Sequence, residues 1–165
     1  YTMQDLIDKG YSPLDFKMWV LQGHYQSERN FTLRDLEAAR KRRLNWRNQI
    51  ARSYQSNTLE NGVATLNQIQ DVLNDNLNSP QALAIIDQAN NHSLEFWQKI
   101  DESLGLDLIT DSPDMNDKAK DILAKRDIAR TNRDYAKSDQ LRDELKKFNL
   151  TVLDTPQGQI WQYLK

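Results

Sequence analysis

Hydrophobic residues recur every three or four positions along most of this chain, the spacing of one face of an α-helix. Two stretches, 59–77 and 82–100, place residues of one face at alternating intervals of four and three, which predicts two long helices with heptad-like seams. Ser79-Pro80 separates them, and Gly105 is expected to end the second. The pattern therefore predicts a mainly helical fold, and the short turns favour an antiparallel bundle over an extended coiled coil.

Two more helices are expected near the amino terminus. Thr2 can cap a short lead-in helix at residues 2–9 that ends before Gly10. Ser12-Pro13 then combines a cap with a proline in the first turn, as at the start of many helices. The following stretch, 14–25, is apolar on nearly every side, so we expect it to form a central helix that is buried on most sides.

A further helix is predicted to begin after Thr32, which forms a capping-box pattern with Asp35. Arg43 falls within the apolar stripe of this helix, and we expect its charged end to extend to solvent. The stripe itself consists of Leu36, Ala39, Trp46, Ile50 and Tyr54.

The composition changes at 105–117, where polar turn-forming residues replace the periodic pattern. We place a domain boundary there. It divides the chain into a helical-bundle domain at 1–110 and a small mixed α/β domain at 117–165.

The second domain is predicted to contain two helices within 118–147, with Asp134 as the cap between them. Residues 150–154 and 159–163 alternate in polarity around the turn Thr155-Pro156-Gln157-Gly158, which predicts a β-hairpin.

Charge and cysteine content exclude several classes of protein. The 165 residues include 22 Lys and Arg and 24 Asp and Glu, a net charge of −2, which excludes a strongly basic binder. The charge is uneven, because 118–147 carries a net +4 and the remaining chain −6. With no cysteine, the chain cannot form disulfides, a thiolate zinc site or a cysteine nucleophile.

The sequence also bears on location. No apolar run approaches the ~20 residues of a membrane span, and the first ten residues lack the core of a signal peptide. We therefore expect a cytoplasmic protein with no membrane partner. Because the chain begins with Tyr1, we also expect it to be a fragment of a longer protein.

Catalytic motifs are scarce. The two histidines lie in different predicted helices without metal-ligand spacing: His24 is expected to be hydrogen-bonded at the core or an interface, and His92 to lie at the surface. A glycine-rich phosphate loop, a nucleophile elbow and paired carboxylates are all missing from the sequence. We therefore predict no catalytic residue and no metal site in this chain.

The basic helical region offers a candidate binding surface. Tyr135, Asp139, Arg142 and Lys146 follow one another at intervals of four, three and four and so share one helical stripe. An aromatic ring can stack on an unpaired base, arginine offers a planar donor fork, and aspartate accepts from base amines. An ordinary surface ion pair explains the same spacing. The apolar residues expected to face the hairpin are Leu141, Leu145 and Phe148.

Other cations are candidates too. Arg130 shares a helical face with Leu123 and Arg126, so it should point toward the next element, although a solvated arginine with a packed stem remains an alternative. A second basic run could follow a phosphate backbone or simply form a solvated face, and it includes Arg40, Lys41 and Arg42.

Three stretches of the sequence together resemble one family. They are GYSPL at 10–14, continuing through His24-Tyr25 to Asn30-Phe31; DNLNSPQALA at 75–84; and VLDTPQG at 152–158, followed by Trp161. In this combination they are similar to the carboxyl-terminal portion of bacterial-type cysteinyl-tRNA synthetases. The resemblance covers essentially the whole chain.

The resemblance implies a class I anticodon-binding helical bundle followed by a small domain that recognises the GCA anticodon of cysteine tRNA. It implies Arg130, Tyr135, Asp139, Arg142 and Asp154 as anticodon-binding residues, with Asp154 entering only through the resemblance. Tyr135 stands where relatives often have tryptophan. Possible tRNA backbone contacts are Arg40, Lys41, Arg42 and Lys146.

The resemblance also implies a parent enzyme, an ATP-dependent cysteine-tRNA ligase with zinc in its catalytic domain. That domain would be a further partner within the same chain, and the fragment alone should be inactive and without a cofactor. We expect a monomer. Two alternatives stay open: a helical interaction or structural module from a paralogue that does not bind tRNA, and a relative that joins cysteine to a small amine.

Overall fold

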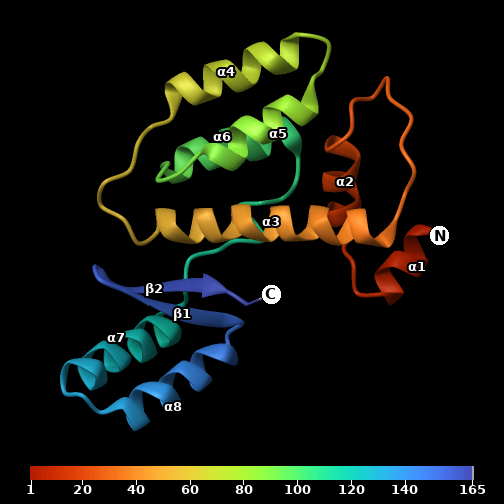
Figure 1. Ribbon diagram of the computed structural model, residues 1–165. Coiled ribbons are helices and arrows are strands. Elements are labelled where there is room, and N and C mark those ends of the chain that lie inside the picture. The colour runs from red at the N-terminus through yellow and green to blue at the C-terminus, as the bar shows by residue number, and fades with distance from the viewer. Residues whose placement is uncertain (165) are drawn as a thin grey trace.

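The computed structural model describes residues 1–164, which form eight helices and one antiparallel pair of strands. The long helix α3 crosses the molecule, with α4, α5 and α6 on one side and the hairpin with α7 and α8 on the other (Figure 1). Lys165, the last residue of the predicted second domain, lies outside the described residues. The elements are α1 (Met3–Asp8), α2 (Pro13–Leu21), α3 (Leu33–Ser53), α4 (Val63–Asn74), α5 (Ser79–Gln88), α6 (Leu94–Leu104), α7 (Asp117–Thr131), α8 (Tyr135–Lys146), β1 (Leu150–Thr155) and β2 (Gly158–Tyr163).

Four predicted helix caps are confirmed, whereas the helix predicted at 59–77 is the shorter α4, Val63–Asn74. Thr2 and Ser12 each form a reciprocal capping box at the start of α1 and α2. Thr32 accepts a hydrogen bond from the Asp35 backbone at the start of α3, and Asp134 caps α8. Each cap satisfies amide groups that have no partner within the helix.

The prediction of a buried central helix at 14–25 is wrong. Helix α2 ends at Leu21 and lies at one end of α3, at the edge of the bundle (Figure 1). Val20 is 50% exposed and Tyr25, beyond the helix, is 63% exposed. An unbroken apolar run could not distinguish an edge helix from a central one.

The second long helix predicted at 82–100 is two helices, α5 and α6. They are separated at 89–93, where Asn91 adopts a left-handed conformation with φ 57°. In this break His92 pairs with Glu60 in a short β-bridge. Its ring is buried, 4.2 Å from the Phe96 ring, so the prediction of a surface histidine is wrong as well.

Arg43 does not extend to solvent as predicted. Its Nε donates to Asp15 at 2.9 Å, and its Nη1 lies 2.6 Å from an Asp111 carboxylate oxygen. Arg43 and Asp15 are both buried. A buried charge needs a partner of opposite sign, and Arg43 has two. Its ion pairs join α2, α3 and the segment after α6.

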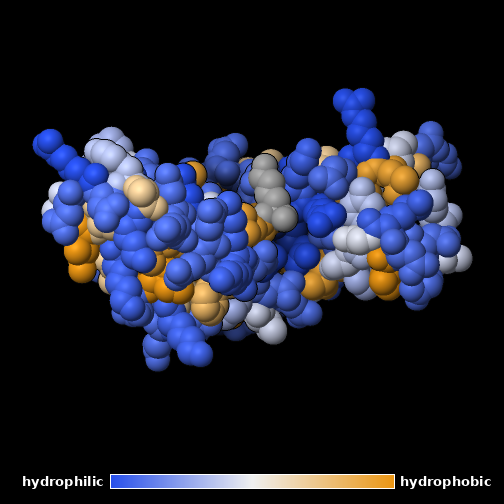
Figure 2. Space-filling model, turned by 90° about the horizontal axis from the view of Figure 1, so that it is seen from below, coloured by the Kyte–Doolittle hydropathy of each residue, from blue (hydrophilic) through white to orange (hydrophobic). Residues whose placement is uncertain are grey.

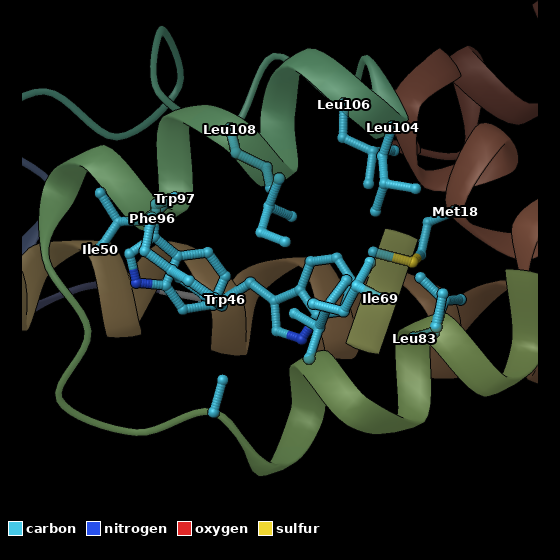
Figure 3. Close-up of a cluster of buried hydrophobic side chains, with 14 of the residues drawn as sticks. Met18, Trp46, Ile50, Ile69, Leu83, Phe96, Trp97, Leu104, Leu106 and Leu108 are labelled. Carbon is cyan, nitrogen blue, oxygen red and sulfur yellow. The ribbon is translucent and has the colours of Figure 1, made fainter. Parts of the chain in front are cut away.

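The first hydrophobic cluster lies between α3 and the helices α4 to α6. Trp46 of α3 extends into it and its ring lies 6.3 Å from that of Trp97 (Figure 3). Trp46 Nε1 donates to Asp87, so the ring is buried without an unsatisfied donor. Three residues of the predicted stripe, Ala39, Trp46 and Ile50, belong to this core, and Tyr54 packs at its edge. Leu36 is buried but lies outside this cluster.

A second cluster holds the carboxyl-terminal elements together. The predicted hairpin is confirmed, with Val152 opposite Trp161 and Asp154 opposite Gln159. Leu145 of α8 packs against it, and Ala51 of α3 belongs to the same cluster. Because α3 contributes to both clusters, the division into separate domains stays a prediction.

The segment between the clusters is firmly packed. Leu106 and Leu108 are completely buried, and Arg47 donates to Ser112 Oγ and to the Asp111 carbonyl. Seen from the side of α7 and α8, the surface is mostly hydrophilic with small hydrophobic patches (Figure 2). None of the helices within residues 1–164 is long and apolar enough to cross a membrane.

Candidate anticodon-binding site

Asp154 is the centre of a cluster of arginines. Arg126 binds its carboxylate with two nitrogens, at 2.8 and 3.0 Å. Nη1 of Arg130 lies 3.1 Å from Asp154 Oδ2, and Nη2 of Arg142 lies 3.7 Å from the same oxygen. One carboxylate thus gathers guanidinium groups from α7 and α8 at strand β1.

Helical spacing and one hydrogen bond to β1 explain how the arginines of α7 and α8 reach the strand. Arg126 and Arg130 are one turn apart on α7, so they share a face. Arg142 on α8 donates to the Val152 carbonyl at 3.0 Å, two residues before Asp154. The turn between the helices is held by the Asp134 amide, which donates to the Ala129 carbonyl at 2.8 Å.

The charges of the cluster are unbalanced. Arg126, Arg130 and Arg142 contribute three positive charges against the single negative charge of Asp154. The hydrogen bonds from Arg126, reinforced by the charges of all three arginines, lower the pKa of Asp154 below 3.8. The carboxylate therefore stays ionised at neutral pH, and the cluster keeps a net positive charge.

Tyr135 and Asp139 precede Arg142 on α8, by about two turns and about one turn. Tyr135 is the first residue of the helix and is 60% exposed, so its ring is open to stacking. Asp139 follows one turn later and is also exposed. Within the described part of the chain, neither side chain is anchored by a hydrogen bond.

The structure thus brings three of the five predicted residues, Arg130, Arg142 and Asp154, into one cluster. Two further members, Arg126 and Gln159, had no predicted role. Gln159 lies opposite Asp154 in the hairpin, accepts from Arg126 at 2.8 Å and donates to the Leu123 carbonyl. The helical face shared by Arg126 and Arg130 and the hairpin register were the signals that could have identified them.

The candidate backbone contacts lie in different surroundings. Lys41 and Arg42 line a groove of about 580 Å³ beside α3 and α5, and Arg42 is paired with Asp87 at 2.9 Å. The Arg40 guanidinium lies 5.6 Å from the centre of the Tyr11 ring. Lys146 is exposed and pairs with Asp143 at 2.6 Å. These cations do not join the Asp154 cluster.

Across residues 1–164, no group of three or more histidine, aspartate or glutamate side chains comes together as metal ligands would.

Comparison with known proteins identifies the region that contains the cluster. Residues 112–161 match the family described as the cysteinyl-tRNA ligase anticodon binding domain. Nearly the whole chain aligns with cysteine-tRNA ligases. The chain is similar to the cysteine-tRNA ligases.

The similarity to individual cysteinyl-tRNA ligases is moderate but extends over most of the chain. The cysteine-tRNA ligase of Chlamydia caviae is 26% identical over 96% of this chain and 39% of the relative. That of Brachyspira hyodysenteriae is 24% identical over 98% of this chain and 40% of the relative. That of Campylobacter jejuni subsp. doylei is 30% identical over 88% of this chain and 39% of the relative. The chain spans about two fifths of the length of the curated relatives it matches.

Proposed function

We propose that this chain is a tRNA-binding part of a cysteine-tRNA ligase. Its α7, α8 and hairpin surface docks the GCA anticodon of cysteine tRNA. The observation that carries the proposal is the arginine cluster at Asp154, which lies within the region similar to an anticodon binding domain. The helical bundle positions this surface relative to the catalytic domain of the parent enzyme.

The chemistry of the cluster suits unpaired bases. The side chains of Arg130 and Arg142 are 39% and 38% exposed, so each can present a donor fork to guanine while remaining close to Asp154. The exposed Tyr135 ring offers a stacking platform. Asp139 is the better acceptor for a base amine, because the oxygens of Asp154 already receive hydrogen bonds from Arg126.

Cations outside the cluster serve the phosphate backbone under this proposal. Lys41 and Arg42 in the groove beside α3, together with Arg40 and Lys146, supply charge without base specificity. Arg42 and Lys146 would exchange their carboxylate partners for phosphate, which is a small change because the pair of Arg42 is partly exposed and that of Lys146 is exposed.

The parent enzyme completes the proposal. It is a cytoplasmic, monomeric, ATP-dependent ligase that charges cysteine tRNA, and its ATP and zinc are bound outside this chain. The chain alone is expected to be catalytically inactive. The alternative of an interaction module that does not bind tRNA is not favoured, because it does not explain why residues 112–161 are similar to an anticodon binding domain.

The test is binding of the 165-residue chain to cysteine tRNA and to the same tRNA with a changed anticodon, at two salt concentrations. If the chain recognises the bases, it should bind the tRNA with the GCA anticodon more tightly than the changed tRNA at both salt concentrations. Equal and salt-sensitive binding of the two tRNAs would reduce the interaction to phosphate contacts and contradict the proposal.

Two variants on α8 sharpen the test. We expect Arg142→Ala to weaken binding of the GCA anticodon by about 1–3 kcal/mol and to affect the changed anticodon much less, since it removes a base contact. Lys146→Ala, one turn away, should weaken the binding of both tRNAs equally and reduce the salt dependence of that binding, since it removes a phosphate contact.

A further inference from the structure

Arg126 is among the most deeply buried charged residues that the structure describes. Its side chain is 1% exposed, yet it lies on a helix that otherwise carries mostly solvent-exposed charges. Its Nη1 donates to both Asp154 and Gln159, and its Nη2 donates to the second oxygen of Asp154. Within residues 1–164 its Nε is buried without a hydrogen-bond partner.

Such burial is costly, so the residue needs a reason to be arginine rather than an apolar side chain. A buried ion pair seldom stabilises a fold more than a well-packed apolar residue of the same size. What the guanidinium provides here is geometry, because a bidentate fork fixes both the position and the plane of a carboxylate. Gln159 fixes the fork in turn by bridging Arg126 to the Leu123 carbonyl.

The fixed carboxylate governs the two exposed arginines. Arg130 and Arg142 both approach Oδ2 of Asp154, each with one terminal nitrogen. Without the charge of Asp154, three guanidinium groups would repel one another. With its orientation fixed, the carboxylate places two partly exposed guanidinium groups side by side before any ligand binds.

We propose that Arg126, supported by Gln159, is a positioning residue that preorganises Arg130 and Arg142 for reading anticodon bases. The inference rests on the proposed function and deepens it. Arg126 does not touch the RNA, and its effect on binding passes through Asp154. Preorganisation improves affinity for the correctly shaped ligand because the ordering of the side chains precedes binding.

The decisive variant is Arg126→Lys, which keeps the charge and loses the bidentate fork. Arg133→Lys is the matched control, because it makes the same chemical change at an exposed arginine in the turn after α7. The measurements are the affinity ratio between GCA and changed-anticodon tRNA, the salt dependence of binding and the folded fraction by circular dichroism.

We expect Arg126→Lys to reduce the affinity ratio about tenfold, the size of one lost base contact. The salt dependence should stay that of the unmodified chain, because the net charge is the same. Arg133→Lys should leave the affinity ratio within about twofold of that of the unmodified chain. A folded Arg126→Lys chain with an unchanged ratio would show that Arg126 only stabilises the fold and would overturn the inference.

A second variant covers the case in which Arg126→Lys does not fold. Gln159→Met removes the neutral partner of Arg126 without changing the charge, and we expect it to reduce the ratio in the same direction by about threefold. An unchanged ratio in this variant would also overturn the inference. The proposed function fails separately, if the unmodified chain shows no preference for the GCA anticodon.

Discussion

At the scale of single residues, the role of each charged side chain depends on the partner that the fold supplies. Arg43 and Arg126 are both buried, and each is held by a carboxylate from a distant part of the chain. Lys146, with a partner three residues away, stays exposed. A buried ion of this kind fixes geometry, whereas an exposed pair contributes little to stability.

Asp154 should make stability depend on pH in a defined direction. Because its pKa is lowered in the folded state, its contribution is present above pH 3.8 and is lost as the pH falls through the lower folded value. We expect Asp154→Asn to lower the free energy of unfolding by about 2–3 kcal/mol at pH 7, since it takes an ionic partner from Arg126.

Urea unfolding between pH 7 and pH 2 checks this prediction. The difference between Asp154→Asn and the unmodified chain should shrink as the pH falls below 3.8. Asp143→Asn is the control, and it should change stability little at any pH because its pair with Lys146 is exposed. A difference between Asp154→Asn and the unmodified chain that stays constant with pH would contradict the linkage.

At the scale of elements, the helices are defined as much by their interruptions as by their periodicity. The break between α5 and α6 contains His92, which forms a β-bridge with Glu60 in the segment just before α4. Gly62 lies just before α4 with φ 67°, and a Cβ at this position would be 2.4 Å from the Phe96 ring. The close approach of the Gly62 backbone to the Phe96 ring, together with the positive φ, therefore requires glycine.

Gly62→Ala should destabilise the protein by roughly 2–4 kcal/mol, because it adds a steric overlap to the left-handed backbone conformation. Gly10→Ala is the matched control, with φ 83° and no heavy atom within 4 Å of the added Cβ. It should cost about 1 kcal/mol from the backbone alone. Urea unfolding measures both, and equal effects would contradict the proposed overlap with Phe96.

At the scale of the whole molecule, α3 links the two clusters. Trp46 and Ile50 of α3 belong to the first cluster and Ala51 to the second, while the adjoining Tyr54 packs against both. Side chains near its end hold the backbone of β2: Gln55 makes two hydrogen bonds with Trp161, and Asn48 accepts from the Tyr163 amide. The proposed anticodon-binding surface is therefore attached to the bundle through α3 and the residues that follow it.

Gln55→Ala should loosen this attachment. It leaves the amide and carbonyl of Trp161 without their partners, so we expect a loss of about 1–3 kcal/mol and faster hydrogen exchange at the Trp161 amide. Gln49→Ala, at a half-buried position of α3 whose side chain makes one exposed hydrogen bond with Asn90, should alter stability by less than about 0.5 kcal/mol. Unchanged exchange at Trp161 would show that the strand is held by packing alone.

Prediction from the sequence succeeded where the responsible interactions are local. Thr2, Ser12 and Asp134 cap helices through groups two or three residues away, and the hairpin follows from its turn and alternation. It failed for Arg43 and His92, which pair with residues about thirty positions away, Arg43 with Asp15 and His92 with Glu60. Of the site, Arg130 and the stripe of α8 could be selected from helical spacing alone.

The helical fold class, four of the helix caps, the hairpin and the basic character of the carboxyl-terminal helices could be predicted from the sequence, since each depends on periodicity, turns and charge within a few residues. Which arginine is buried, which carboxylate holds it and which cations remain exposed became known from the folded arrangement alone. The reason is physical: the fate of a charge depends on its desolvation and its partner, and folding brings Arg126, Asp154 and Gln159 together from separate elements.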